Sequence, residues 1–162
     1  MEFAKTVPIE TIGTDNSWPL AGVQEFFCWA QRRAGNGATV RILLLIVFGA
    51  AGTLARYGLQ GLVQYRTGGA FPSGTLAVNL SGCFFLGLIA QYTLNHLLIP
   101  SEWRMAITIG FFGAFTTFSS FGWETIKMLE DGEWLRASLY VGTSVLAGLL
   151  LTLAGIRIAN RF

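Results

Sequence analysis

The sequence predicts an all-α membrane protein in which four helices cross the bilayer. Hydrophobic residues make up 52% of the 162 residues and charged residues only 12%, whereas about 25% of residues are charged in ordinary soluble domains. The mean hydropathy of the chain is +0.53. Because a membrane-spanning helix needs about 20 mainly apolar residues, four such helices fit between residue 41 and the carboxyl terminus.

The four predicted helices are separated by residues that favour loops. The first helix covers residues 42–63 and the second covers residues 74–98, and a glycine pair and a proline between them mark a loop. The third helix begins near Trp103, and the fourth covers residues 134–158. Trp103 and Trp134 therefore fall where aromatic side chains meet lipid headgroups.

Residues 1–40 do not follow this pattern, because their polarity is mixed and they show no sustained helical period. We predict that they form a peripheral or disordered extension ahead of a four-helix domain at residues 41–162. Two other hypotheses remain open for this segment. One is a short interfacial helix at residues 20–33, and the other is a true start near Val40, which would make the extension a gene-prediction artefact.

Basic residues are shared equally between the two sides of the predicted four-helix domain. One side holds Arg41, Arg104, Arg157 and Arg161, and the other holds Arg56, Arg66, Lys127 and Arg136. Equal numbers give the positive-inside rule no preference, which predicts insertion in both orientations. Two opposite orientations pair naturally as an antiparallel homodimer with a twofold axis. The basic residues of the extension would disturb this balance.

The third predicted helix combines glycines, phenylalanines and hydroxyl side chains in residues 110–121, GFFGAFTTFSSF. Hydroxyl groups offer hydrogen bonds at a depth without bulk water, and glycines loosen a helix so that backbone groups can face a ligand. Phe118 and Phe121 lie three residues apart on one helical face, and Glu124 extends this stripe. The pattern indicates an ion path.

Neutral hydrogen-bond donors dominate the predicted membrane segments, because Glu124, toward the end of the third helix, is the only acidic residue inside one of them. The Asn79 amide, the hydroxyl groups and the positive edges of phenyl rings favour an anion over a cation. Because these groups are small and their surroundings apolar, the anion should be small and should exchange most of its water for hydrogen bonds. The hydroxyl groups belong to Thr75, Thr116, Thr117, Ser119, Ser120, Tyr140 and Ser144.

Three short motifs carry a resemblance to a known family. They are Gly52-x-x-x-Arg56-Tyr57, then Gly74-Thr75-Leu76-x-Val78-Asn79-x-x-Gly82, and then Gly110-Phe111-x-Gly113-x-x-Thr116-Thr117-Phe118-Ser119-x-Phe121. In these motifs the chain resembles the bacterial fluoride channels of the Fluc or CrcB family from Arg41 to its end. The resemblance implies an antiparallel, dual-topology homodimer with a broken third helix and two fluoride pores. It further implies passive export of cytoplasmic fluoride across the cell inner membrane, which lowers fluoride toxicity.

The resemblance also implies roles for individual residues. Phe118, Phe121 and Asn79 would line the fluoride pore, with the phenyl ring edges facing the anion. The backbone carbonyls of Gly113 and Thr116 would hold a structural sodium ion on the dimer axis. The other residues of the implied polar track are Thr75, Thr117, Ser120, Glu124, Tyr140 and Ser144.

The sequence departs from the family at Gly148, one turn beyond Ser144, where some members carry a further hydroxyl. Other interpretations also remain open for single residues. The phenylalanine stripe could be packing, the Asn79 amide could form an interhelical hydrogen bond, and Arg56 could reach a headgroup or steer anions.

Other functional classes fit the sequence less well. A small dual-topology exporter of cationic drugs needs a membrane-embedded carboxylate, and residues 42–63 contain none. An enzyme needs a catalytic set, which the single His96 and scattered carboxylates do not supply. Nothing in the pattern indicates a nucleic-acid partner. A non-transporting assembly subunit would explain the glycines through packing, but it would not explain the hydroxyl and phenylalanine track.

Overall fold

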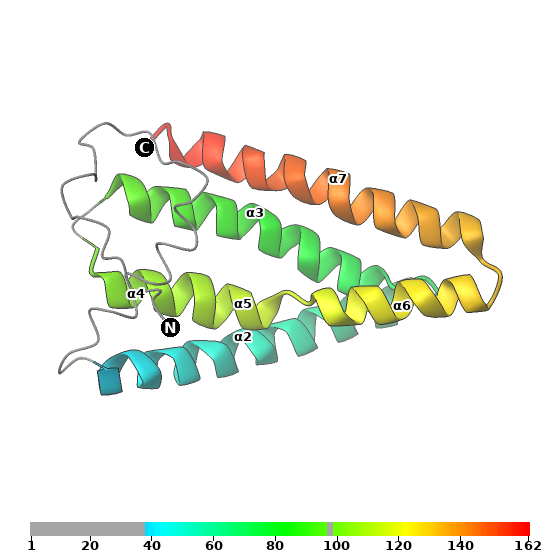
Figure 1. The fold of residues 1–162 in the computed structure, drawn as a ribbon, viewed down its shortest axis with the longest axis horizontal. Helices are drawn as coiled ribbons and strands as arrows, with labels where there is room; N and C mark the ends of the chain where they lie inside the picture. The colour runs from blue at the N-terminus through cyan, green and yellow to red at the C-terminus, as the bar shows by residue number, and fades with distance from the viewer. Residues whose placement is uncertain (1–37, 97–98) are drawn as a thin grey trace, which may run out of the picture. The chain divides into compact units, whose positions relative to one another are not determined.

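The computed structural model describes residues 38–96 and 99–162, and every regular element within these ranges is a helix (Figure 1). Of the extension predicted at residues 1–40, residues 1–37 lie outside the described residues, and so does the possible interfacial helix at residues 20–33. Residues 38–40 belong instead to the first helix, because the helical hydrogen bonds of that span begin before Arg41. Four helical segments in the described ranges are long and apolar enough to cross a membrane. The described residues thus confirm the predicted all-α architecture, with four helical segments able to cross a membrane.

Three of the four spans are single helices. They are α2 (Ala38–Thr67), α3 (Ser73–Asn95) and α7 (Trp134–Ala159). The remaining span, Ser101–Glu130, is divided into four consecutive elements. These are α4 (Ser101–Met105), the π-helical turn η2 (Ala106–Phe112), α5 (Gly113–Phe115) and α6 (Phe118–Glu130).

Helix α2 extends about one turn beyond each end of the predicted range 42–63. It ends where Gly68 takes a positive φ of 61°, a conformation that costs glycine little and that closes many helices. The side chain of Gln64 then joins this loop to α3, because its Oε1 accepts a hydrogen bond from the Gly74 backbone N–H at 3.1 Å. A glutamine of α2 therefore caps the start of α3.

A tight turn joins α6 to α7, at the end far from the carboxyl terminus (Figure 1). Gly132 has a φ of 75°, and its N–H donates to the Leu129 carbonyl at 3.1 Å. The next N–H, that of Glu133, donates to the Met128 carbonyl at 2.8 Å. These two bonds close α6 with a glycine in the left-handed region, so that α7 can return alongside it.

Glycines allow the helices to touch backbone to backbone. The most extensive pairing is that of α3 with α7. A Cβ atom on Gly155 would lie 2.7 Å from the backbone nitrogen of Leu88, and one on Gly87 would press on the Thr152 carbonyl. The crossing therefore needs small residues on both helices, as is common between membrane helices.

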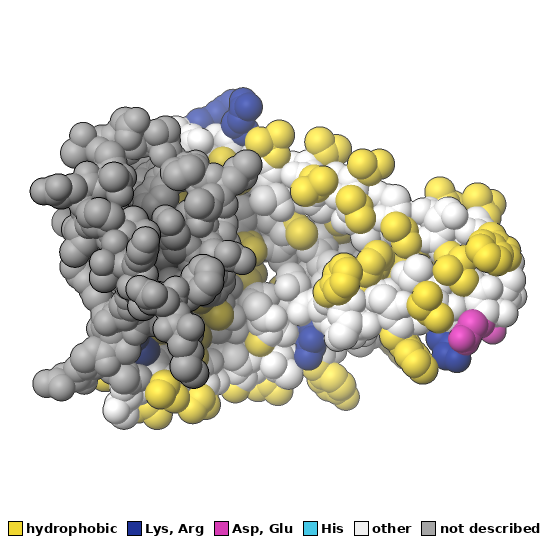
Figure 2. Space-filling model, viewed as in Figure 1, with side chains coloured by type: hydrophobic (Ala, Val, Ile, Leu, Met, Phe, Trp, Pro, Cys, Tyr) yellow, Lys and Arg dark blue, Asp and Glu magenta, His cyan; other side chains and the backbone are white. Residues whose placement is uncertain are grey.

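Hydrophobic side chains are spread over the outside of the described helices, and charged side chains are few on the face that Figure 2 shows. The buried interior is correspondingly small. One buried cluster contains Val78, Phe112 and Phe115, and a second contains Met128, Ala137 and Tyr140. A bilayer requires this kind of apolar protein exterior, because the surface of the protein faces lipid there instead of water.

Replacing Gly155 with alanine should lower the thermal unfolding midpoint in detergent by several degrees. The added methyl group must push α7 away from the α3 backbone, which costs about 1–3 kcal/mol. The control is Gly142→Ala in the same helix, where a Cβ would meet no atom within 4 Å. That variant should be neutral or slightly stabilised, because alanine favours helix. Equal midpoints for the two variants would contradict the close α3–α7 contact.

Candidate functional site

Two residues with extended backbone separate α5 from α6. Thr116 has φ −85° and ψ 158°, and Thr117 has φ −146° and ψ 112°. Asn79 of α3 bonds to this extended segment twice. Its Nδ2 donates to the Thr117 carbonyl at 3.0 Å, and its Oδ1 accepts from the Thr117 N–H at 2.8 Å. One side-chain amide thus replaces both of the hydrogen bonds that the Thr117 backbone would make inside a helix.

The extended segment leaves two backbone carbonyls without their usual helical donors. In a continuous α-helix the N–H of residue 117 would bond to the Gly113 carbonyl, but here it donates to Asn79. Likewise, the N–H of Ser120 would bond to the Thr116 carbonyl, but it donates to the Thr117 hydroxyl oxygen at 3.2 Å. Gly113 and Thr116 are the two residues whose carbonyls were predicted to bind a cation.

The hydroxyl groups around this segment take part in local structure. Thr117 is the N-cap of α6, since its Oγ1 accepts from the Ser120 N–H and donates to the Ser120 Oγ at 3.0 Å. Thr116 donates its hydroxyl to the Phe112 carbonyl at 3.0 Å. The predicted polar residues Thr117 and Ser120 therefore start α6 and fix its direction.

A row of aromatic rings follows from the start of α6 toward α7. The rings of Phe118 and Phe121 are 5.6 Å apart, and those of Phe121 and Tyr140 are 5.1 Å apart. Phe118 is 83% exposed in the single chain, whereas Tyr140 is fully buried. The row thus runs from an open face of the subunit into its interior.

At the inner end of this row, three helices meet at the carboxylate of Glu124. Its Oε1 accepts a hydrogen bond from the Thr75 hydroxyl of α3, and its Oε2 accepts one from the Tyr140 hydroxyl of α7, both at 2.7 Å. Because a hydroxyl group has one hydrogen, both donors are committed to the carboxylate in this arrangement. Thr75, Glu124 and Tyr140, all predicted from the sequence, lie together.

Ser144 lies one turn along α7 from Tyr140, and its buried Oγ has no hydrogen-bond partner among the described residues. One turn further on, a Cβ at Gly148 would lie 3.5 Å from the Cys83 sulfur, which is an ordinary contact distance. The fourth helix therefore presents an uncommitted hydroxyl at Ser144 and room for a small side chain at Gly148.

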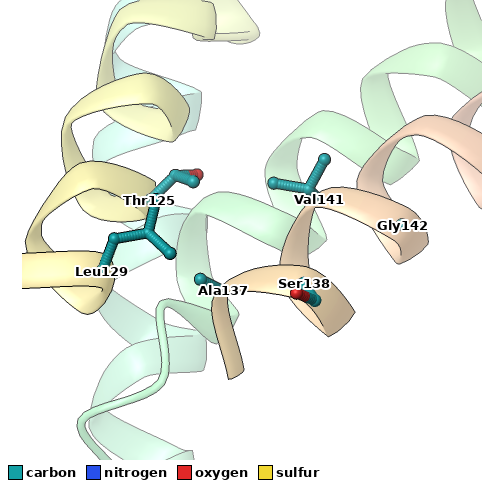
Figure 3. Close-up of a pocket in the computed structure, with 6 residues that line it drawn as sticks. All are labelled: Thr125, Leu129, Ala137, Ser138, Val141 and Gly142. Atoms are coloured by element: carbon teal, nitrogen blue, oxygen red, sulfur yellow. The ribbon is translucent and has the colours of Figure 1, made fainter. Parts of the chain in front are cut away.

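A groove of about 400 Å³ lies between α6 and α7 near the turn that joins them. In Figure 3, Thr125 and Leu129 line its α6 side, opposite α7 residues that begin with Ala137. Among the described residues that line it, none belongs to the predicted ion path. The groove is thus separate from the aromatic row and the Glu124 cluster.

Comparison with known proteins decides the family. Residues 43–156 match the family described as CrcB-like protein, Camphor Resistance (CrcB). The chain belongs to this family. All of the residues predicted to form the site fall inside the matched range, which spans the aromatic row, the extended segment and the Glu124 cluster.

Several CrcB-family relatives carry the name fluoride-specific ion channel FluC. The relative from Geobacter sulfurreducens is 52% identical over 120 residues, which cover 74% of this chain and 97% of the relative. The relative from Geobacter metallireducens is 49% identical over 119 residues, covering 74% and 96% of the two chains. The relative from Geotalea daltonii is 48% identical with the same coverage of each chain, 74% and 96%.

The fold brings the predicted site residues of this CrcB-family chain into two connected groups. Asn79 joins the extended segment and the start of α6, and Glu124 joins α3 to α7. Ser144 bonds to neither group among the described residues. Asn79 makes the interhelical hydrogen bond that the sequence left open as an alternative, and the second N–H of its amide remains for another acceptor.

Sequence reasoning missed Gln60 of α2. Its Nε2 donates to the Thr75 hydroxyl oxygen at 3.2 Å, so Gln60 extends the Glu124 cluster to the first membrane helix. The available signal was a polar amide inside an apolar span, because such groups usually have a partner or a function. That signal was weak in the sequence, since nothing there indicates that Gln60 and Thr75 lie on facing helices.

Asn79→Asp should destabilise the protein by about 1–3 kcal/mol, because a carboxylate oxygen would then face the Thr117 carbonyl and two acceptors would meet. The thermal unfolding midpoint in detergent measures this. Asn95→Asp is the matched control on the same helix. The Asn95 amide also donates to a backbone carbonyl, that of Ala159 at 3.3 Å, but Asn95 is exposed, so water can replace the bond. Equal losses of stability in the two variants would mean that the hydrogen bonds between Asn79 and Thr117 matter no more than the bond made by exposed Asn95.

Proposed function

We propose that this chain is a passive, fluoride-selective channel of the cell inner membrane that exports cytoplasmic fluoride and so lowers its toxicity. The observation that carries the proposal is the 48–52% identity, over nearly their whole length, to relatives named fluoride-specific ion channels. The aromatic row and the hydroxyl groups beside it support the same function. They offer ring edges and O–H donors, which stabilise an anion.

The energetics of fluoride explain why a passive leak suffices. Fluoride is the base of a weak acid, so the neutral acid enters from acidified surroundings, ionises in the more alkaline cytoplasm and is trapped there as the anion. An anion-selective channel lets the membrane potential drive the trapped anion out. The protein needs no fuel for this and catalyses no reaction.

The donors open to a passing anion are those whose hydrogens are not already committed. They include the second N–H of Asn79, the hydroxyls of Ser120 and Ser144 and the ring edges of Phe118 and Phe121. Each of these groups is neutral. A small anion would therefore exchange its hydration shell for a few direct contacts, which favours fluoride because it is small and a strong hydrogen-bond acceptor.

The functional unit in this proposal is an antiparallel, dual-topology homodimer. Equal numbers of basic residues on the two sides support insertion in both orientations. Phe118 is exposed on the same short segment as Gly113, and a ring that lines a pore needs a second wall opposite it. Gly113 is also exposed, so its face is open to a second copy.

A structural sodium ion on the dimer axis fits the carbonyls of Gly113 and Thr116. Both carbonyls lack the N–H donors of a continuous helix, since these bond to Asn79 and to the Thr117 hydroxyl. Backbone carbonyl oxygens are suitable ligands for a hard cation. When bound, the ion would supply a fixed positive charge between the two pores, which favours anions there.

Fluoride efflux from liposomes that hold the purified protein, with chloride as the control anion, tests the function. Phe118→Ile and Phe121→Ile should slow fluoride efflux about tenfold, because side-chain volume is nearly kept while the positive ring edge is lost. Phe85→Ile, at an exposed position of α3, should conduct as the wild type does. A wild type that releases fluoride no faster than chloride would overturn the proposed function. Normal fluoride flux in both Phe118→Ile and Phe121→Ile would mean that these two rings serve only in packing.

Gly113→Leu should abolish the dimer while leaving each subunit folded. A Cβ at Gly113 meets no atom within 4 Å in the single chain, so crowding by leucine must come from a second copy. Gly122→Leu, at a position with equally open space, is the control. Single-molecule labelling gives the oligomeric state. A conducting protein that proves monomeric or parallel contradicts the proposed assembly.

Replacement of sodium by a bulky organic cation should lower fluoride efflux slowly in the wild type, as the buried ion escapes. Efflux from the same liposomes is followed over hours, with sodium added back at the end. Recovery on re-addition is the expected result. Efflux that stays constant through prolonged exchange would remove the cation from the mechanism.

A further inference from the structure

A series of hydrogen bonds links all four membrane spans beside the aromatic row. It begins at Gln60 of α2, whose Nε2 donates to the Thr75 hydroxyl oxygen at 3.2 Å. The Thr75 hydroxyl then donates to Glu124, as the Tyr140 hydroxyl does from the other side. Thr75 and Tyr140 are almost completely buried, so water has little access to replace these bonds.

The donor and acceptor roles of the side chains determine the direction of each bond in this series. The hydroxyl hydrogens of Thr75 and Tyr140 both point toward Glu124, because its two carboxylate oxygens accept from them. The oxygen of Thr75 must then accept from its other neighbour, and the amide of Gln60 must turn its N–H to it. A side chain at position 60 that could only accept would reverse the Thr75 hydroxyl and remove one donor from Glu124.

We propose that Gln60 is a positioning residue for conduction, which holds the Thr75 hydroxyl toward Glu124 and thereby keeps the carboxylate bound between α3 and α7. This inference rests on the proposed function. Glu124 lies one turn from Phe121, whose ring contacts Tyr140. A carboxylate released from Thr75 would be free to turn toward the aromatic row, where its negative charge repels an anion.

The chain offers a matched pair of substitutions at position 60. Gln60→Glu keeps the size of the side chain but places an acceptor against Thr75, so the Thr75 hydrogen has two competing carboxylates. Gln60→Leu also removes the hydrogen bond, but it leaves Glu124 as the acceptor for that hydrogen. A purely structural role predicts that leucine is at least as harmful as glutamate. The positioning role predicts the opposite order.

Fluoride efflux from liposomes should fall about 30-fold in Gln60→Glu and about threefold in Gln60→Leu. Both are then measured with Thr75→Val, which removes the hydroxyl that Gln60 controls. In that background the glutamate should be no slower than the leucine. Equal losses in the two single variants would overturn the inference. So would a glutamate penalty that persists with Thr75→Val, because the added charge would then act directly on the anion.

Protein stability provides a readout that does not depend on conduction. Thermal unfolding of Gln60→Leu, Thr75→Val and the double variant should show strong coupling, with the double variant little worse than Thr75→Val alone. Additive losses would overturn the contact on which the inference depends. A wild type without fluoride efflux but with this coupling would instead count against the proposed function, so the two failures are distinguishable.

Discussion

The two hydrogen bonds between Asn79 and Thr117 are the interaction on which the rest of the site depends. Inside a bilayer each backbone N–H and C=O needs a partner, and an unpaired one costs about 1–3 kcal/mol or more. An extended segment in a membrane span is therefore tolerated only where side chains complete its hydrogen bonds. Asn79 does this from α3, and Thr117 caps the helix that follows. Together they set where α6 begins and which way its phenylalanines point.

The same pairing links structure to the chemistry proposed for the site. By capturing the Thr117 N–H, Asn79 takes the donor that would otherwise cover the Gly113 carbonyl. Its amide still has a second N–H that could serve an anion. A residue predicted as a pore donor is thus also the residue that maintains the local backbone. Loss of conduction in an Asn79 variant would by itself not separate these roles, whereas stability and flux measured together would.

The glycines of the chain have two different environments, which the sequence pattern does not distinguish. Gly87 and Gly155 are pressed against the backbone of the facing helix and hold the subunit together. Gly113 faces open space, next to a segment whose Phe118 is also exposed. Membrane lipid covers apolar surfaces without cost, so exposure of a ring alone means little. Exposure of a glycine and of a ring on one short segment, next to carbonyls without helical donors, is more informative, and the second subunit proposed above rests on this combination.

The sequence by itself determined the family and the four helical segments able to cross a membrane, and it supplied the residue types of the candidate site, because apolar length and a specific motif are local properties of the chain. Its predicted boundaries were less accurate at α2, where helical hydrogen bonds continue until Gly68 allows a positive φ. Only the tertiary structure decided to which neighbour each polar group donates its hydrogen bond. The commitment of Thr75 and Tyr140 to Glu124, and the presence of Gln60 behind Thr75, depend on how separate helices face one another. No spacing along one helix contains that information.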